Sequence, residues 1–160
     1  HVSELAPATL VDMLGTAEKP YWGQWRSNGR SQTFSGAALE QGMSRNAGPQ
    51  VRPFQGRSAI LVDHQVRSAG EVMAYGYQRS GLGSVIGTQT AGAVSGGSPF
   101  AMPGGFMLYV AGSSMEFDGK RLEGVGVTPD HWVERPLPYA AGADPVLDAA
   151  VDHLAKAATP

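Results

Sequence analysis

The chain has 160 residues, of which 42% are hydrophobic and 16% charged, and its formal net charge is −2. This length fits one globular domain with a substantial core, and the near-neutral charge argues against a nucleic-acid or anionic-membrane partner. The absence of cysteine excludes a disulfide framework and a thiolate metal site. The histidines also lack metal-ligand spacing, so we expect no metal and no organic cofactor.

The N-terminal third shows one short element. Residues 7–14, "PATLVDML", predict a helix because Pro7 suits the first helical position and Gly15 can end it. From residue 19 to residue 53 no hydrophobic period is sustained, which predicts a long irregular segment.

The middle of the chain predicts one β-α-β unit over residues 58–87. The apolar run "SAILVD", 58–63, has the length of a buried parallel strand, and "SVIG", 84–87, fits a second one. Between them lie a sharp turn and a helix that Gly81 can end.

The last third predicts short strands and a helix. The run "FMLYVAGSSMEF", 106–117, reads as two strands of a hairpin around residues 112–114. Residues 122–134 predict a turn that leads into a last strand. Residues 144–157 predict a terminal helix with Asp144 as its N-cap.

Two roles compete for Ser68, which ends the turn after the first buried strand. In the first role "SAGE", 68–71, is a capping box in which Glu71 reaches back to the Ser68 N–H. In the second role Ser68 is a nucleophile, because a strand-to-helix turn exposes its side chain. The Ala69 N–H would then stabilise an oxyanion at the positive end of the helix dipole. Spacing alone favours the cap.

Three segments in register resemble the tail-specific, or C-terminal processing, serine peptidases: "ILVDHQVRSAGEVMAYGYQRSG", "VIGTQTAG" and "LEGVGVTPD". The resemblance implies an α/β fold of the ClpP/crotonase type, with repeated β-β-α units, a mixed sheet and outer helices. It also implies that residues 1–160 are the C-terminal portion of one such domain. Residues 1–53 would then hold a helix and a long irregular segment, 54–134 the core with the catalytic serine, and 144–157 the terminal helix.

The same resemblance assigns roles to residues of this sequence. Ser68 corresponds to the nucleophile and the Ala69 N–H to an oxyanion donor. The Ser–Lys dyad is absent, because Ala93 stands where the family has its lysine and Gly97 where it has a helper glutamine. The chain is thus closer to the tricorn-like branch, in which a histidine is the base. Glu123 corresponds to a supporting catalytic glutamate of that branch, or is a solvated carboxylate in a turn.

Parts of the site have no counterpart in the sequence. The family's upstream histidine and its second oxyanion loop are missing, so we expect an upstream segment or a partner chain to supply them. His64 is an internal alternative for the base, although such a residue is more often structural. The Gly-rich segment 91–97 lacks the ending of a phosphate loop, and we expect its Gly92, Gly96 and Gly97 to border the substrate cleft.

These observations predict a serine endopeptidase that hydrolyses peptides or protein C-terminal tails through an acyl-enzyme, with little activity in this portion alone. The alternative is a non-catalytic relative that binds peptides or hydrophobic ligands, in which Ser68 is only a cap. An acyl-CoA enzyme of the crotonase type is disfavoured by the "SAGE" turn. The sequence does not define a compartment, and the resemblance favours a periplasmic or secreted location.

Overall fold

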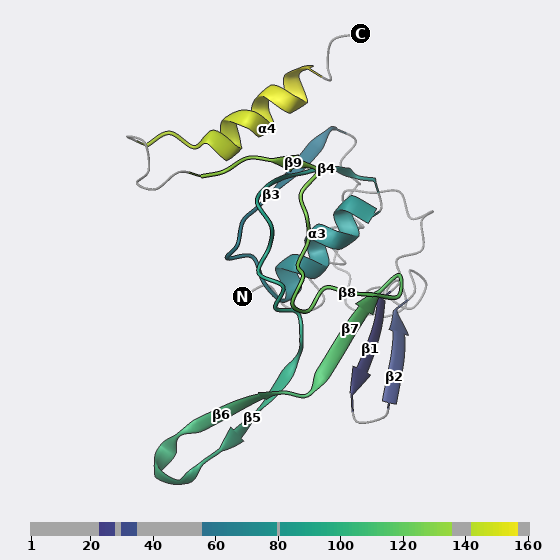
Figure 1. Ribbon diagram of the computed structural model, residues 1–160, viewed down its shortest axis with the longest axis vertical. Helices are drawn as coiled ribbons and strands as arrows, with labels where there is room; N and C mark the ends of the chain where they lie inside the picture. Colours follow the sequence, from purple (N-terminus) through teal and green to yellow (C-terminus); the bar gives the residue numbers. More distant parts are fainter. Residues whose placement is uncertain (1–22, 28–29, 35–55, 80, 136–141, 157–160) are drawn as a thin grey trace, which may run out of the picture.

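The computed structural model describes residues 23–27, 30–34, 56–79, 81–135 and 142–156 (Figure 1). In chain order its elements are β1 (Gly23–Ser27), β2 (Arg30–Phe34), β3 (Ser58–Val62), α3 (Ala69–Arg79), β4 (Gly83–Gly87), β5 (Gly97–Ala101), the 3-10 turn η1 (Pro103–Gly105), β6 (Met107–Ala111), β7 (Ser113–Phe117), β8 (Lys120–Arg121), β9 (His131–Trp132) and α4 (Pro145–Lys156). The predicted α/β class with parallel and antiparallel sheets is confirmed. The predicted helix 7–14 lies outside the described residues.

The β-α-β unit predicted over residues 58–87 is confirmed. Strands β3 and β4 are parallel, with Ser58 opposite Gly83 and Val62 opposite Gly87, and β9 extends the sheet beside β4. Parallel strands are apolar along their length because helices cover both faces of the sheet. Val85 packs with α3 on one face, while the neighbouring Ser84 bonds to α4 on the other. Figure 1 shows the two helices on opposite sides of this sheet.

The hydrophobic core gathers where α3 meets the parallel sheet. Its buried members are Val62, Ala74, Tyr77, Val85, Val94, Phe117, Leu122 and Val127. Tyr75 extends this packing to the antiparallel sheet β2-β1-β7-β8, because its ring centroid lies 5.2 Å from that of Phe117. The Tyr75 hydroxyl donates to Asp118 at 3.0 Å, and burial together with this carboxylate raises the pKa of Tyr75 to about 12. Helix α3 is therefore held between two sheets.

The terminal helix begins as predicted. The Asp144 carboxylate accepts the Leu147 N–H at 3.2 Å, which is the bond of an N-cap residue. Its His153 is half-buried, and the Nε2 atom of this histidine lies 2.9 Å from the Ser84 hydroxyl of β4. Within the described ranges, no helix has both the length and the apolar character needed to span a membrane.

The prediction of an irregular segment over residues 19–53 is wrong at β1 and β2. These strands are antiparallel, and Ser27 lies opposite Arg30. The two residues between them are Asn28 and Gly29, the dipeptide most typical of a tight hairpin connection. The missed signal was thus a turn signal, because the strands themselves, "GQWRS" and "RSQTF", carry too few apolar residues to show a period.

The predicted hairpin within residues 106–117 is also wrong, although both of its strands exist. Strand β6 turns back to pair with β5, and β7 pairs with β1 and β8. The tight turn lies earlier, at η1, where Gly104 and Gly105 have φ values of 82° and 80°. Glycine reaches this left-handed region without steric cost. The chain therefore reverses at residues 103–105 and passes from one sheet to another at Gly112.

Gly83 has no room for a side chain, which gives a stability prediction. A Cβ on Gly83 would lie 2.1 Å from the Ser58 carbonyl oxygen and 2.2 Å from the Tyr77 hydroxyl, whereas a Cβ on Gly112 would have no atom within 4 Å. We expect Gly83→Ala to lower the free energy of unfolding by about 1–3 kcal/mol or more, and Gly112→Ala to change it little. Denaturant unfolding of the protein measures both, and equal losses would contradict the packing described.

Candidate active site

The turn after β3 holds Ser68 in an unusual conformation. The Asp63 carboxylate accepts the Gln65 N–H at 2.8 Å, and the Asp63 carbonyl accepts the Val66 N–H at 3.0 Å. The chain then reaches Ser68, whose φ is 53° and whose side chain is exposed. Few residues other than glycine adopt this left-handed region, and such conformations concentrate at functional sites. The predicted exposed serine at a strand-to-helix turn is therefore present.

The capping box predicted for residues 68–71 does not form. The Ser68 N–H donates to the Ala93 carbonyl at 2.8 Å, so it is not available to Glu71. The Ser68 carbonyl accepts the Glu71 N–H and closes the first turn of α3 through the main chain. The left-handed φ explains the difference, because it turns the Ser68 N–H away from the helix and toward residue 93.

Two groups at the start of α3 are left without a bond among the described residues. The Ser68 hydroxyl forms no hydrogen bond there, and neither does the Ala69 N–H. The first N–H groups of a helix have no partner within the helix and carry its positive dipole end. The arrangement thus presents a hydroxyl and an N–H donor on neighbouring residues, as nucleophilic attack on a carbonyl requires.

Glu71 instead organises the loop that faces Ser68. Its side chain is fully buried, and its carboxylate accepts three hydrogen bonds: from the Thr90 hydroxyl at 2.6 Å, the Gly92 N–H at 2.7 Å and the Ala93 N–H at 2.7 Å. A buried carboxylate is costly unless such donors surround it. Because the Ala93 carbonyl in turn holds the Ser68 N–H, Glu71 fixes both sides of the turn that carries the serine.

Thr90 connects this cluster to the late "GVGVTPD" segment. Its hydroxyl accepts the Val127 N–H at 2.7 Å, and the Gly124 N–H donates to the Gly92 carbonyl at 2.7 Å. Gly126 has a φ of 78°, and a Cβ there would lie 2.5 Å from the Thr90 carbonyl oxygen. The three sequence segments that carried the family resemblance therefore meet in one hydrogen-bonded assembly.

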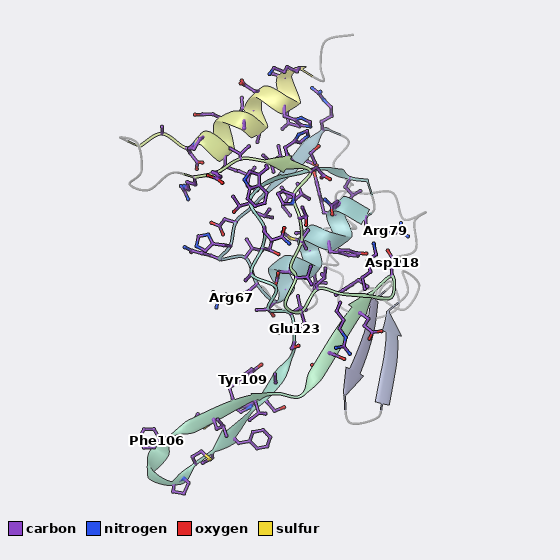
Figure 2. All side chains as sticks on the ribbon, in the orientation of Figure 1. Arg67, Arg79, Phe106, Tyr109, Asp118 and Glu123 are labelled. Atoms are coloured by element: carbon purple, nitrogen blue, oxygen red, sulfur yellow. The ribbon has the colours of Figure 1, made fainter. Side chains whose placement is uncertain are left out.

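Glu123 binds the next part of the same loop. Its Oε2 accepts the Val94 N–H at 2.9 Å and the Ser95 N–H at 2.7 Å. Desolvation opposes the charged form, but hydrogen bonds from the Ser95 side chain and from both N–H groups outweigh it and lower the pKa of Glu123. This carboxylate is thus not a solvated turn residue without partners. It anchors the segment that follows Ala93, and Figure 2 shows it beside the base of the β5–β6 hairpin.

The remaining predicted residues lie in this loop or in the turn that follows β3. Gly92 is buried beneath the "GVG" segment, where a Cβ would meet the Val125 N at 2.8 Å. Gly96 accepts hydrogen bonds from the N–H groups of residues 112 and 113, and Gly97 begins β5. His64 lies exposed in the turn and forms no hydrogen bond with other described residues. That the loop borders a substrate cleft stays a prediction.

No cluster of three or more metal-ligating side chains occurs in the part of the chain that the structure describes.

The buried carboxylate gives a prediction about loop order. Glu71→Gln places an amide NH₂ among three donors, so we expect a loss of about 2–3 kcal/mol of stability and faster amide exchange at Gly92 and Ala93. The matched variant Glu123→Gln should accelerate exchange at Val94 and Ser95 and cost less, because that side chain is exposed. Hydrogen exchange with NMR detection measures both, and the same exchange pattern in the two variants would contradict the separate roles.

The lowered pKa of Glu123 gives a pH dependence. Its folded pKa lies below the usual glutamate value, so its contribution to stability is complete above that usual value and is lost as the pH falls through the lowered pKa. We expect the amide proton shifts of Val94 and Ser95 to titrate with a midpoint below that of an ordinary glutamate. A higher midpoint, or a titration that persists in Glu123→Gln, would contradict the assignment.

The chain also matches a known protein family. Residues 21–133 match peptidase family S41. Tricorn protease of Thermoplasma acidophilum is 32% identical over 104 residues, which cover 62% of this chain and 10% of that protein.

Solved structures share the fold at low identity. A peptidase structure from Parabacteroides merdae has a TM-score of 0.67 at 14% identity and covers 95% of this chain and 48% of its own. The photosystem II D1 C-terminal processing protease has a TM-score of 0.57 at 18% identity, with 82% and 31% covered. The chain thus spans less than half the length of these relatives. Because the family match extends over more than half of its residues, the protein belongs to peptidase family S41.

Proposed function

We propose that this chain carries the nucleophile of a serine peptidase, and that the nucleophile is Ser68. The observation that supports the proposal is the exposed Ser68 hydroxyl at a left-handed φ of 53°, next to the Ala69 N–H at the start of an 11-residue helix. Helix capping does not explain this strained conformation, because the Ser68 side chain makes no capping bond among the described residues.

The reaction would be peptide hydrolysis in two steps. The Ser68 oxygen attacks the carbonyl carbon and loses its proton to a base, while the Ala69 N–H donates to the developing oxyanion. The C–N bond then breaks, the proton passes to the leaving amine, and the acyl group remains on Ser68. Water releases the acid product and restores the hydroxyl.

The base would come from outside the described residues. Ala93 offers no amine where a Ser–Lys dyad has its lysine, and its carbonyl is bonded to the Ser68 N–H. His64 shares no hydrogen bond with Ser68. An upstream segment or a partner chain would therefore supply the base and a second oxyanion donor. The solved relatives support this proposal, since more than half of each has no counterpart in this chain.

Glu123 would act as a positioning residue in this scheme. Its carboxylate already holds two N–H groups of the loop, and its lowered pKa makes it a poor proton acceptor at neutral pH. It would keep residues 94 and 95 in place beside the attacking serine.

The substrate would be an extended peptide or an unstructured protein C-terminal tail. One structural relative is a C-terminal processing protease by name. The loop 91–97, which is held against the Ser68 turn, contains no charged residue. Such a surface suits main-chain recognition of an extended peptide.

A fluorophosphonate probe tests the nucleophile. In the full-length protein we expect covalent labelling that maps to Ser68 and is abolished in Ser68→Ala, whereas Ser98→Ala on the exposed strand β5 keeps it. The 160-residue chain alone should label slowly or not at all, because the base is missing. A folded full-length protein that never labels would instead favour a non-catalytic binding protein, and rapid labelling of the isolated chain would contradict the missing base.

A further inference from the structure

The β5–β6 hairpin extends away from the rest of the molecule. Figure 1 shows it as a two-stranded ribbon below the parallel sheet, and Figure 2 places Phe106 at its far end and Tyr109 closer to its root. The root is fixed at Gly96, whose carbonyl accepts the N–H groups of Gly112 and Ser113. Strands β5 and β6 pair only with each other among the described strands. An isolated two-stranded ribbon is marginally stable in water, so this hairpin needs a further partner.

The hairpin is uncharged over its whole length and mostly apolar. Every residue from 98 to 112 is exposed. Phe106, Tyr109 and Phe100 are 73%, 65% and 53% exposed, and Met102, Met107, Leu108 and Val110 are exposed as well. A fully covered aromatic side chain buries about 150–250 Å². At the exposed fractions given above, these three rings alone offer roughly 300–450 Å² for burial. This approaches the largest apolar patches of ordinary monomers, about 300–600 Å², before the aliphatic side chains are added.

The hydrogen-bond register distinguishes the two outer edges of the hairpin. Met102 N–H donates to the Phe106 carbonyl and Gly112 N–H to the Gly96 carbonyl, so the even-numbered residues between them form the bonded pairs of the ladder. The odd-numbered residues point their main-chain groups outward.

On β5 this outer edge is blocked. Pro99 has no N–H, and the Gly97 N–H already donates to the Tyr109 hydroxyl at 3.0 Å. On β6 the outward N–H and carbonyl groups of Met107, Tyr109 and Ala111 bond to nothing in the described chain. Proline is a common device against edge pairing, whereas an exposed apolar edge accepts another strand. The hairpin is thus protected on β5 and open on β6.

We propose that the β6 edge is a self-association surface, and that its occupant is β6 of a second copy of this chain. Two identical strands related by a two-fold axis are antiparallel, so they pair without further adjustment. A register centred on Tyr109 places Met107 opposite the second copy's Ala111 and joins the two hairpins into one four-stranded sheet. Leu108 then becomes a cross-strand neighbour of the second copy's Val110.

The charge pattern favours a second copy over a charged partner. With no charged side chain between Thr88 and Met115, two identical hairpins approach without repulsion, and the surface offers no charge for an acidic or basic partner to recognise. The three exposed rings supply roughly half of the about 800 Å² that each side of a standard interface buries, and the exposed Met, Leu and Val side chains add to it.

Two proline substitutions at paired positions test the proposal. Met107 and Ala101 lie opposite each other, and the N–H of each points outward, so proline removes no bond within the hairpin. Phe106, with φ −77° and ψ 152°, already has a conformation suited to the residue before a proline. We expect the full-length protein to dimerise in sedimentation equilibrium. Met107→Pro should raise the dimer dissociation constant roughly tenfold or more, because each of the two copies loses the intermolecular hydrogen bond of its residue 107 N–H. Ala101→Pro should leave the dissociation constant unchanged.

Amide exchange gives the second readout. The amides of Met107, Tyr109 and Ala111 should become protected as the protein concentration rises, and this protection should be lost in Met107→Pro. A protein that stays monomeric at high concentration overturns the proposal, whether those amides exchange freely or are protected by another part of the same protein. A dimer that Met107→Pro leaves intact overturns it as well.

Discussion

The buried carboxylate of Glu71 is the constraint on which the site depends. A carboxylate without contact to water must be surrounded by donors, and here the donors come from one loop: the Thr90 hydroxyl and the N–H groups of Gly92 and Ala93. Since Glu71 lies in the first turn of α3, it fixes the distance between that helix and the loop. The Ala93 carbonyl is then in place to hold the Ser68 N–H. The conformation of the serine is thus set by a residue that has no role in the proposed chemistry.

The loop is held from a second side by the segment after β8. Glu123 binds the N–H groups of Val94 and Ser95, and Gly124 donates to Gly92. Two carboxylates from opposite directions therefore support one short uncharged loop, one of them buried and the other exposed. This double support explains how a Gly-rich loop, which pays a high entropic cost for order, keeps a single geometry next to Ser68. Gly92 and Gly126 belong to the sequence segments that resemble the family, and a Cβ at either position would meet main-chain atoms.

Local patterns predicted the elements better than their pairing. The β-α-β unit followed from two apolar runs flanking a helix, and the start of α4 followed from Asp144. The strands β1 and β2 were missed because their side chains show no alternation, although Asn28-Gly29 marked the connection. At the site, the turn position of Ser68 was predictable from sequence. The hydrogen-bond partners of Glu71 were not predictable. The same four residues, "SAGE", fit a capping box as well as the buried loop anchor that forms here, in which Ser68 has a left-handed φ.

The link between Thr90 and Val127 has a consequence for the order in which the protein is made. Ribosomes deliver the chain from its N-terminus, so Ser68 and α3 emerge well before the segment that closes the cluster. Until Val127 has left the exit tunnel, the Thr90 hydroxyl lacks one of its two bonds, and the loop that holds the Ser68 amide is only half anchored. A nascent chain would carry the serine but not its finished surroundings, which delays any reactivity until most of the domain has been translated.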